Sequence, residues 1–189
     1  MVAALPNPMT YQDRERALAD VPDNDSRRFE LIQGEEVVSP SPTTAHQLVS
    51  GNTFRVIDMF SRPRNLGELF FAPTDVKLSV YDVVIPDLCF VSQERSSIIG
   101  TKAIEGAPDL VVEILSPSTR RQDRVRKLAL YAAWGVREYW IIDIEARGLT
   151  IYTLQDGHYV AAPEREGTVG SVVLSGLVVT ISDLFEGVR

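Results

Sequence analysis

Residues 110–143 read LVVEILSPSTRRQDRVRKLALYAAWGVREYWIID, and this stretch decides the fold class. The first six residues form an apolar run of strand length, and the closing EYWIID forms another. Between them, Ser116-Pro117 is typical of a helix start and Gly135 of a helix end, so a helix is predicted from Pro117 to about Trp134. Strand, helix and strand in this order indicate an α/β domain.

The same signals extend the pattern in both directions along the chain. Thr10 with Asp13 predicts a short capped helix that ends before Pro22, and Ser41 with Pro42 predicts the start of a helix over 43–60. A hairpin centred on Gln33-Gly34 and a late hairpin at Asp156-Gly157 are also expected. Further strands are predicted at 68–72, 75–80, 84–92 and 177–181, followed by a short turn capped by Ser182.

Size and composition indicate one domain spanning residues 1–189. The chain has 189 residues with 44% hydrophobic content, enough for one packed core. We expect residues 1–9 to form a loose arm and residues 29–154 to form the core. Because Cys89 is the only cysteine and no signal peptide or membrane-spanning run is evident, a cytoplasmic protein is expected.

Two carboxylates interrupt apolar runs that read as buried strands. Glu113 lies within LVVEIL, and Asp87 lies within VVIPDLCFV. An ionised carboxylate buried without partners would cost several kcal/mol, so each requires compensation. A divalent cation, a neighbouring Lys or Arg, or a dense set of hydrogen bonds could supply it. On adjacent strands, about 4.8 Å apart, the two side chains could share one Mg²⁺ ion.

These residues resemble the PD-(D/E)XK nuclease fold, in which Pro-Asp on one strand precedes Asp or Glu, any residue and Lys on the next. Pro86-Asp87 and Glu113 match this pattern, whereas Leu115 occupies the lysine position. The strings FELIQGE, SPSPTTAHQ, VVIPDLCFV and residues 107–143 resemble the Uma-two family of endonucleases within that fold. In that family the lysine is displaced onto the following helix, which implies Lys127 here.

The resemblance implies a restriction endonuclease-like core, with a central mixed sheet flanked by helices, an N-terminal hairpin and a C-terminal accessory hairpin. It implies a DNA endonuclease that depends on Mg²⁺ or Mn²⁺ and acts as a homodimer. Asp87 and Glu113 are the expected metal ligands, and Lys127 is the expected water-orienting or charge-stabilising group.

Four residues are candidates for supporting the site. At about 100° per residue, Arg124, Lys127 and Tyr131 share a sector about 60° wide on the predicted helix, beside its apolar face. Lys127 could then lean toward Glu113 along its alkyl stem. His46, near the start of the 43–60 helix, and Glu30, on the first hairpin, complete the set.

Other interpretations stay open at this stage. Asp87 and Glu113 could pair with Lys127 and Arg124 as a structural network, which would make the protein a non-catalytic nucleic-acid-binding or protein-interaction module. The net charge of −7 disfavours strong nonspecific DNA binding, although TRRQDRVRK (119–127) is locally basic. RNA or another phosphate ester is an alternative substrate. Three further residues are interpreted as structural: Asp109, Asp143 and Cys89.

Overall fold

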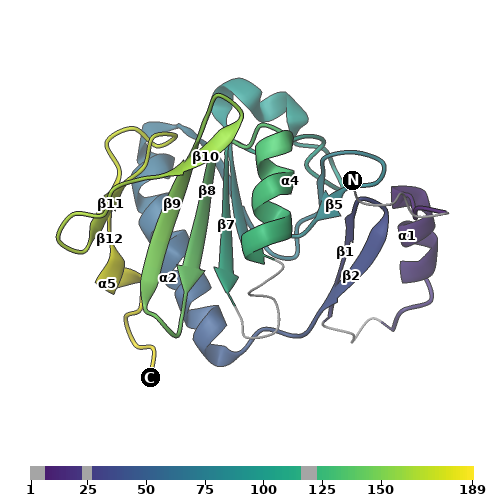
Figure 1. Ribbon diagram of the computed structural model, residues 1–189, viewed down its shortest axis with the longest axis horizontal. Helices are drawn as coiled ribbons and strands as arrows, with labels where there is room; N and C mark the ends of the chain where they lie inside the picture. The colour runs from purple at the N-terminus through teal and green to yellow at the C-terminus, as the bar shows by residue number, and fades with distance from the viewer. Residues whose placement is uncertain (1–6, 23–26, 116–122) are drawn as a thin grey trace.

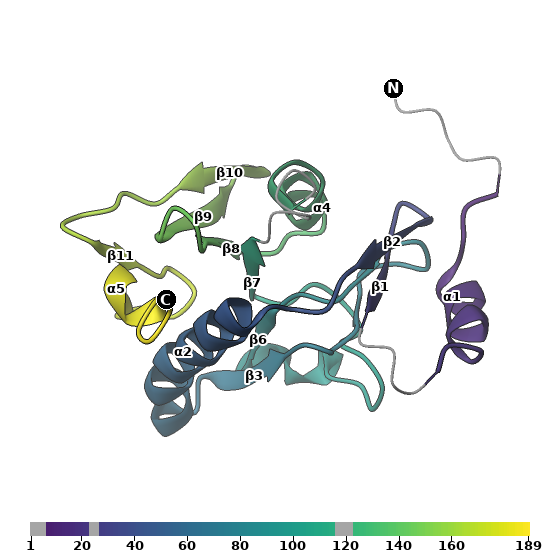
Figure 2. The same cartoon turned by 90° about the horizontal axis from the view of Figure 1, so that it is seen from below.

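The computed structural model describes residues 7–22, 27–115 and 123–189, without the side chains of residues 123 and 124. Within these residues a central six-stranded sheet has the order β10-β9-β8-β7-β6-β3 (Figure 1 labels β7 to β10, and Figure 2 also labels β6 and β3). Strands β7 and β8 pair in parallel, and the other neighbours pair antiparallel, which confirms the predicted mixed sheet. The strands are β3 (Gly67–Phe71), β6 (Leu88–Ser92), β7 (Leu110–Leu115), β8 (Glu138–Asp143), β9 (Gly148–Gln155) and β10 (His158–Ala161).

A smaller sheet, of order β2-β1-β5-β4, lies beside the central one. Its strands are β1 (Arg28–Ile32), β2 (Glu35–Ser39), β4 (Val76–Lys77) and β5 (Val83–Val84). Strands β1 and β2 form the predicted N-terminal hairpin, and both residues of its turn, Gln33 and Gly34, have positive φ, as a two-residue hairpin turn requires.

The prediction of one continuous strand over 84–92 is wrong. It divides into β5 and β6, which belong to different sheets, and Pro86 lies at the break. Proline lacks the N–H that a continuous ladder needs, and the chain changes sheet at this point. The break leaves Asp87 directly before β6, at the junction of the two sheets.

Helices cover both faces of the central sheet, as expected (Figure 2). One face packs against α2 (Thr44–Ser61), α5 (Ile181–Leu184) and the pair β11 (Thr168–Gly170) and β12 (Val178–Thr180). The other packs against α4 (Leu128–Ala133). Along β7, Val112 and Ile114 face the α2 side, whereas Val111 and Leu115 face the α4 side. Alternation therefore places Glu113 on the α4 side.

The helix boundaries show which caps form. Thr10 and Asp13 form the predicted capping box of α1 (Tyr11–Leu18). The prediction of Ser41 as the cap of the next helix is wrong, because Thr43 accepts the His46 amide at 3.2 Å and α2 begins after it. Ser182 is likewise not a cap, because it lies inside α5. Three-residue and six-residue 3₁₀ segments, η1 (Arg62–Arg64) and η2 (Gln93–Ile98), follow α2 and β6.

The helix predicted over 117–134 is observed in its second half. A π-helical turn, η3 (Asp123–Lys127), leads into α4, which ends before Gly135 with its φ of +78°. The predicted start at Ser116-Pro117 lies outside the described residues. The late hairpin, β9 and β10, extends the central sheet through β8, so it belongs to the core. Among the described residues, no helix is both long enough and apolar enough to cross a bilayer.

Candidate functional site

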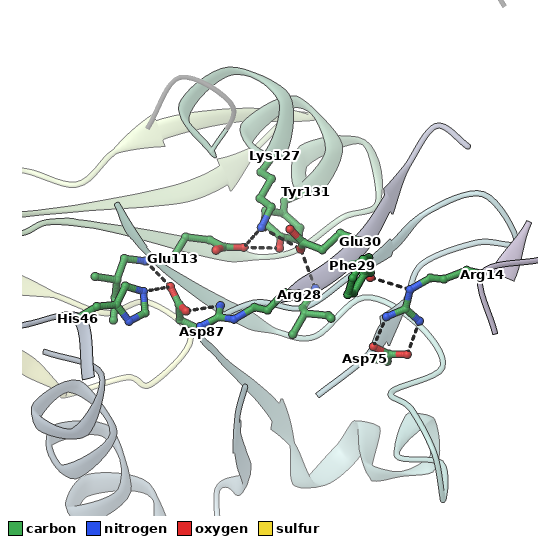
Figure 3. A network of polar contacts seen from close by, with 12 residues as sticks. Arg14, Arg28, Phe29, Glu30, His46, Asp75, Asp87, Glu113, Lys127 and Tyr131 are labelled. Atoms are coloured by element: carbon green, nitrogen blue, oxygen red, sulfur yellow. Dashed lines mark hydrogen bonds and ion pairs between the residues drawn. The ribbon is translucent and has the colours of Figure 1, made fainter. Parts of the chain in front are cut away.

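Asp87 and Glu113 converge on one side of the central sheet. The antiparallel register pairs Leu88 with Val112, and continuing it by one residue brings Asp87 opposite Glu113. Directly opposed residues have Cβ atoms about 5 Å apart. Both are almost fully buried, with 2% and 3% of their surface exposed. Figure 3 shows the two carboxylates in one network of polar contacts.

Three donors hold the Asp87 carboxylate. Arg28 Nη1 lies 2.6 Å from Oδ1, and Oδ2 accepts the Ile114 amide at 2.8 Å and lies 3.2 Å from His46 Nε2. Burial by itself would raise the pKa of Asp87, but the hydrogen bond and charge of His46, the Arg28 guanidinium and the Ile114 amide together lower it to about 2. The carboxylate is therefore ionised at neutral pH.

Glu113 is held from the helix side. Its Oε1 lies 2.8 Å from Lys127 Nζ and accepts the Tyr131 hydroxyl at 2.8 Å. Burial raises the pKa of Tyr131, and the negative charge of Glu113 raises it further, so the phenol stays a hydrogen-bond donor. The shared sector of the helix thus delivers both side chains to the carboxylate, as its spacing predicts.

Glu30 joins the network from the smaller sheet. Its Oε1 lies 2.9 Å from Lys127 Nζ and accepts the Ile85 amide at 2.7 Å. The Lys127 ammonium is therefore shared by two buried carboxylates, Glu30 from β1 and Glu113 from β7 (Figure 3). Each of these three side chains is at least 96% buried.

The network borders a cavity of about 480 Å³. The cavity lies beyond the carboxyl end of β7, between the two sheets, where the chain passes from β2 into α2 and from β8 into β9. Among the described residues, its charged lining comes from Arg28, Glu30, His46, Asp87, Glu113, Lys127 and Glu145. The rest is mainly apolar or small, from residues 39–43, Ala45, Ile114, Leu115 and Ile144.

Six of the seven predicted site residues therefore meet in one network, and the seventh, Arg124, has its side chain outside the described residues. Arg28 also joins this network, through its bond to Asp87, and was not among the predicted site residues. One signal was available, because Arg28 and Glu30 are two residues apart on a strand and must share a face. The residues that meet are Glu30, His46, Asp87, Glu113, Lys127 and Tyr131.

The residues interpreted as structural lie away from this network or pack in the core. Asp109 precedes β7, about 13 Å along the strand from Glu113, and accepts the Ser92 amide and bonds from Arg95 and Arg137. Asp143 Oδ1 accepts the Ala146 amide in the turn after β8. Burial raises the pKa of the Cys89 thiol, which is consistent with core packing.

The site offers few groups for holding a metal ion. Among the described residues, no group of three or more His, Cys, Asp or Glu side chains is arranged around one ion position. Asp87 and Glu113 both line the cavity, from directly opposed positions of neighbouring chain segments. Two carboxylates are the usual protein contribution to a Mg²⁺ site, because Mg²⁺ keeps most of its waters.

A solved structure has the same fold. It is the crystal structure of a "putative nuclease belonging to DUF820" from Anabaena variabilis ATCC 29413, with a TM-score of 0.76 and 21% sequence identity. The match covers 95% of this chain and 98% of the other. The two proteins therefore share a mixed α/β fold, which in this chain places acidic residues at the junction of its two sheets.

Sequence comparison gives the family. Residues 12–182 match the family Uma2, described as "Putative restriction endonuclease". The chain belongs to this family, which confirms the resemblance seen in its sequence. No curated protein matches the chain.

Proposed function

We propose that this protein is an endonuclease that hydrolyses phosphodiester bonds in DNA and depends on Mg²⁺ or Mn²⁺. The observation that carries the proposal is that Asp87 and Glu113, from neighbouring strands, border one cavity with the Lys127 ammonium 2.8 Å from Glu113. The description of the Uma2 family, and that of the structural relative, support nuclease chemistry.

The donor set fits the proposed metal. Asp87 is ionised, Glu113 lies on the same face of the sheet, and hard cations such as Mg²⁺ and Mn²⁺ favour carboxylate oxygens. In this proposal Asp87 and Glu113 hold the ion. When bound, it would supply a polarised water and positive charge beside a phosphoryl oxygen.

The protein's own side chains divide the remaining work. Lys127 lines the cavity at a position fixed by Glu30 and Glu113, where an ammonium can orient a water or stabilise charge on a phosphate oxygen. Arg28 also lines the cavity, and its guanidinium can donate to phosphate while one nitrogen holds Asp87. His46 and the Ile114 amide fix the second oxygen of Asp87.

A cleavage assay tests the proposal. Purified protein is incubated with plasmid DNA and with single-stranded circular DNA in Mg²⁺, Mn²⁺ or EDTA, alongside Asp87→Ala and Lys127→Met. We expect cutting only with the metal and the wild-type chain, because each variant removes a group at the reacting centre. Cutting that persists in Asp87→Ala would refute the assignment.

A non-catalytic module is the second candidate, and one observation favours it. Asp87 and Glu113 already have protein partners, as they would in a structural ion-pair network. Such a network should not bind a metal ion. Calorimetric titration with Mn²⁺ separates the two, because the nuclease proposal requires a heat of binding that Glu113→Gln weakens, whereas the module predicts none.

The homodimer remains part of the proposal. Two copies would place two centres in one assembly, which would allow both strands of a duplex to be cut in one encounter. Val160, exposed on β10 at the edge of the central sheet, is an apolar residue that such an interface could bury. Sedimentation equilibrium would measure the assembly, and a monomer at micromolar concentration would count against it.

A further inference from the structure

We propose that the site takes its substrate as an unpaired strand, with one nucleotide entering the cavity and its phosphate directed at Asp87 and Glu113. This inference rests on the proposed function and names the substrate class. It concerns the depth, size and lining of the cavity, which together describe what can reach the carboxylates.

The depth of the acidic groups sets the first requirement. Glu30, Asp87, Glu113 and Lys127 expose 2% to 3% of their surfaces, so a scissile phosphate must enter the cavity to meet them. In a duplex each phosphate lies on a stiff, stacked helix, and moving one inward requires unstacking its nucleotide. An unpaired strand has flexible phosphates and does not require this.

The size of the cavity sets the second requirement. A volume of about 480 Å³ lies in the range of small-molecule pockets, which enclose most of a compact ligand. Such a space admits a single nucleotide, whereas a duplex needs a long open groove. Proteins that act on extruded or unpaired nucleotides use pockets of this kind.

The cavity lining has a charged side and an apolar side, and these suit the phosphate and the base of a nucleotide. Charged groups, Arg28 and Lys127 with the carboxylates, gather at one side and suit the phosphate and its metal. Apolar groups form much of the remaining wall and suit the face of a base or sugar: Pro40, Pro42, Ala45, Ile114, Leu115 and Ile144. A site that contacted only the phosphates of a duplex would have no use for the apolar wall.

The charge of the chain agrees with this substrate. A net charge of −7 gives little general attraction for the dense phosphate array of a duplex. Apolar contacts with a base or sugar add binding energy that phosphate neutralisation does not supply.

Binding measurements test this without relying on cleavage. Fluorescence anisotropy is recorded with oligothymidylate and oligouridylate of about 12 nucleotides, and with a blunt-ended duplex of two complementary strands of similar length. The measurements are made in EDTA and in Ca²⁺. We expect the single strands to bind at least about tenfold more tightly than the duplex, and the better of the two identifies DNA or RNA as the source.

A matched pair of variants locates the binding in the cavity. Ala45→Leu places a larger side chain in the cavity wall, and Thr44→Leu makes a similar change at the neighbouring exposed position of α2, which does not line it. We expect Ala45→Leu to weaken single-strand binding about tenfold and Thr44→Leu to leave it unchanged. Circular dichroism checks that both variants are folded. If Ala45→Leu does not fold, displacement of the oligonucleotide by thymidine or uridine 5′-monophosphate from the wild-type protein decides the point.

The outcomes separate this inference from the proposed function. Equal or tighter duplex binding, no binding of any oligonucleotide, or single-strand binding unaffected by both Ala45→Leu and the mononucleotide would each overturn the inference. Cleavage of plasmid by the wild-type protein would still uphold the nuclease proposal in each case. Conversely, cavity-dependent binding without metal-dependent cleavage would uphold the inference about the ligand and overturn the catalytic proposal.

Discussion

Two buried glutamates on the parallel strands β7 and β8 are satisfied in opposite ways. Glu113 faces the α4 side, where its neighbours are the charged Lys127 and the Tyr131 hydroxyl, beside a cavity. Glu138 faces the α5 side, where neutral donors surround it and it borders no part of that cavity. Its carboxylate accepts from Trp140 Nε1 at 2.6 Å, Ser171 Oγ at 2.8 Å, and the Val172 and Val173 amides at 2.6 and 3.1 Å.

The contrast gives a criterion for distinguishing a structural carboxylate from a carboxylate of a candidate site. Both are buried and both have partners, so burial and hydrogen bonding alone do not distinguish them. A carboxylate enclosed by neutral N–H and O–H donors fixes local structure, here the segment after β11. A carboxylate such as Glu113, which shares the Lys127 ammonium with Glu30 and borders a cavity, can exchange that partner for a substrate or a metal ion.

The largest expected effect is on cleavage, and it should separate the two glutamates. Glu113→Gln keeps the shape of the side chain but removes the charge that the proposed metal and Lys127 require, so we expect cleavage to fall about a hundredfold or more. Glu138→Gln is the matched control and should cut at the wild-type rate per folded molecule. Initial rates on a labelled substrate measure both, and equal losses would remove the distinction drawn here.

The second prediction concerns the stability of the protein, and here we expect the effect at Glu138 rather than at Glu113. Glu138→Gln replaces one acceptor oxygen by an amino group that faces buried donors, so we expect the free energy of unfolding to fall by about 2 kcal/mol. Urea denaturation measures the change, with exposed Glu36→Gln as a control that should lie within about 0.5 kcal/mol of wild type. A Glu138→Gln protein as stable as wild type would show that these hydrogen bonds contribute little.

A smaller effect on stability is expected when a single tyrosine hydroxyl is removed, either at the candidate site or outside it. Tyr131→Phe deletes the bond to Glu113, and Tyr159→Phe deletes a 2.8 Å bond to the Val136 carbonyl outside the site. Each should cost about 1 kcal/mol of unfolding free energy. Cleavage should decline in Tyr131→Phe alone, by less than about tenfold, because Lys127 still holds Glu113. A decline of the same size in both variants would indicate a general loss of stability.

The smallest effect concerns pH and the third carboxylate, Asp109. Burial would raise its pKa, but the Ser92 hydrogen bonds and Arg95 lower it below the ordinary value near 3.8. A folded-state pKa below the unfolded one stabilises the protein above the unfolded pKa, and this contribution is lost as pH falls through the folded value. The stability difference between wild type and Asp109→Asn should therefore shrink as pH falls below about 4, and unfolding curves from pH 7 to pH 2 would measure it.

Much of the fold and most of the positions in the site could be predicted from the sequence, because they depend on local patterns. The apolar runs around Asp87 and Glu113 fix strands whose alternation sets the face of each carboxylate. Helical spacing places Lys127 and Tyr131 together. Lys127 and Tyr131 meet Glu113 because of the strand and helix patterns, and the pairing of β6 with β7 brings Asp87 beside them. The chemical roles of these residues remain predictions.

The parts that could not be predicted depend on how the two sheets meet. Arg28 follows another arginine at the start of a hairpin and reads as a surface residue, and only the packing of that hairpin against the main sheet brings it to Asp87. Pro86 interrupts an apolar run, but nothing local tells that the chain changes sheets there. The cap of α2, Thr43, was missed because Ser41-Pro42, two residues earlier, gives the stronger local signal of a cap followed by proline.

The salt bridges of Lys127 have a consequence for when the protein can act. The ammonium joins Glu30 of the small sheet to Glu113 of the large one, so the constellation exists only after the two layers have docked. A molecule that is incompletely folded or partly unfolded has the same side chains, but they are not brought together. For the proposed nuclease, this ties activity to the state in which the two sheets are packed together.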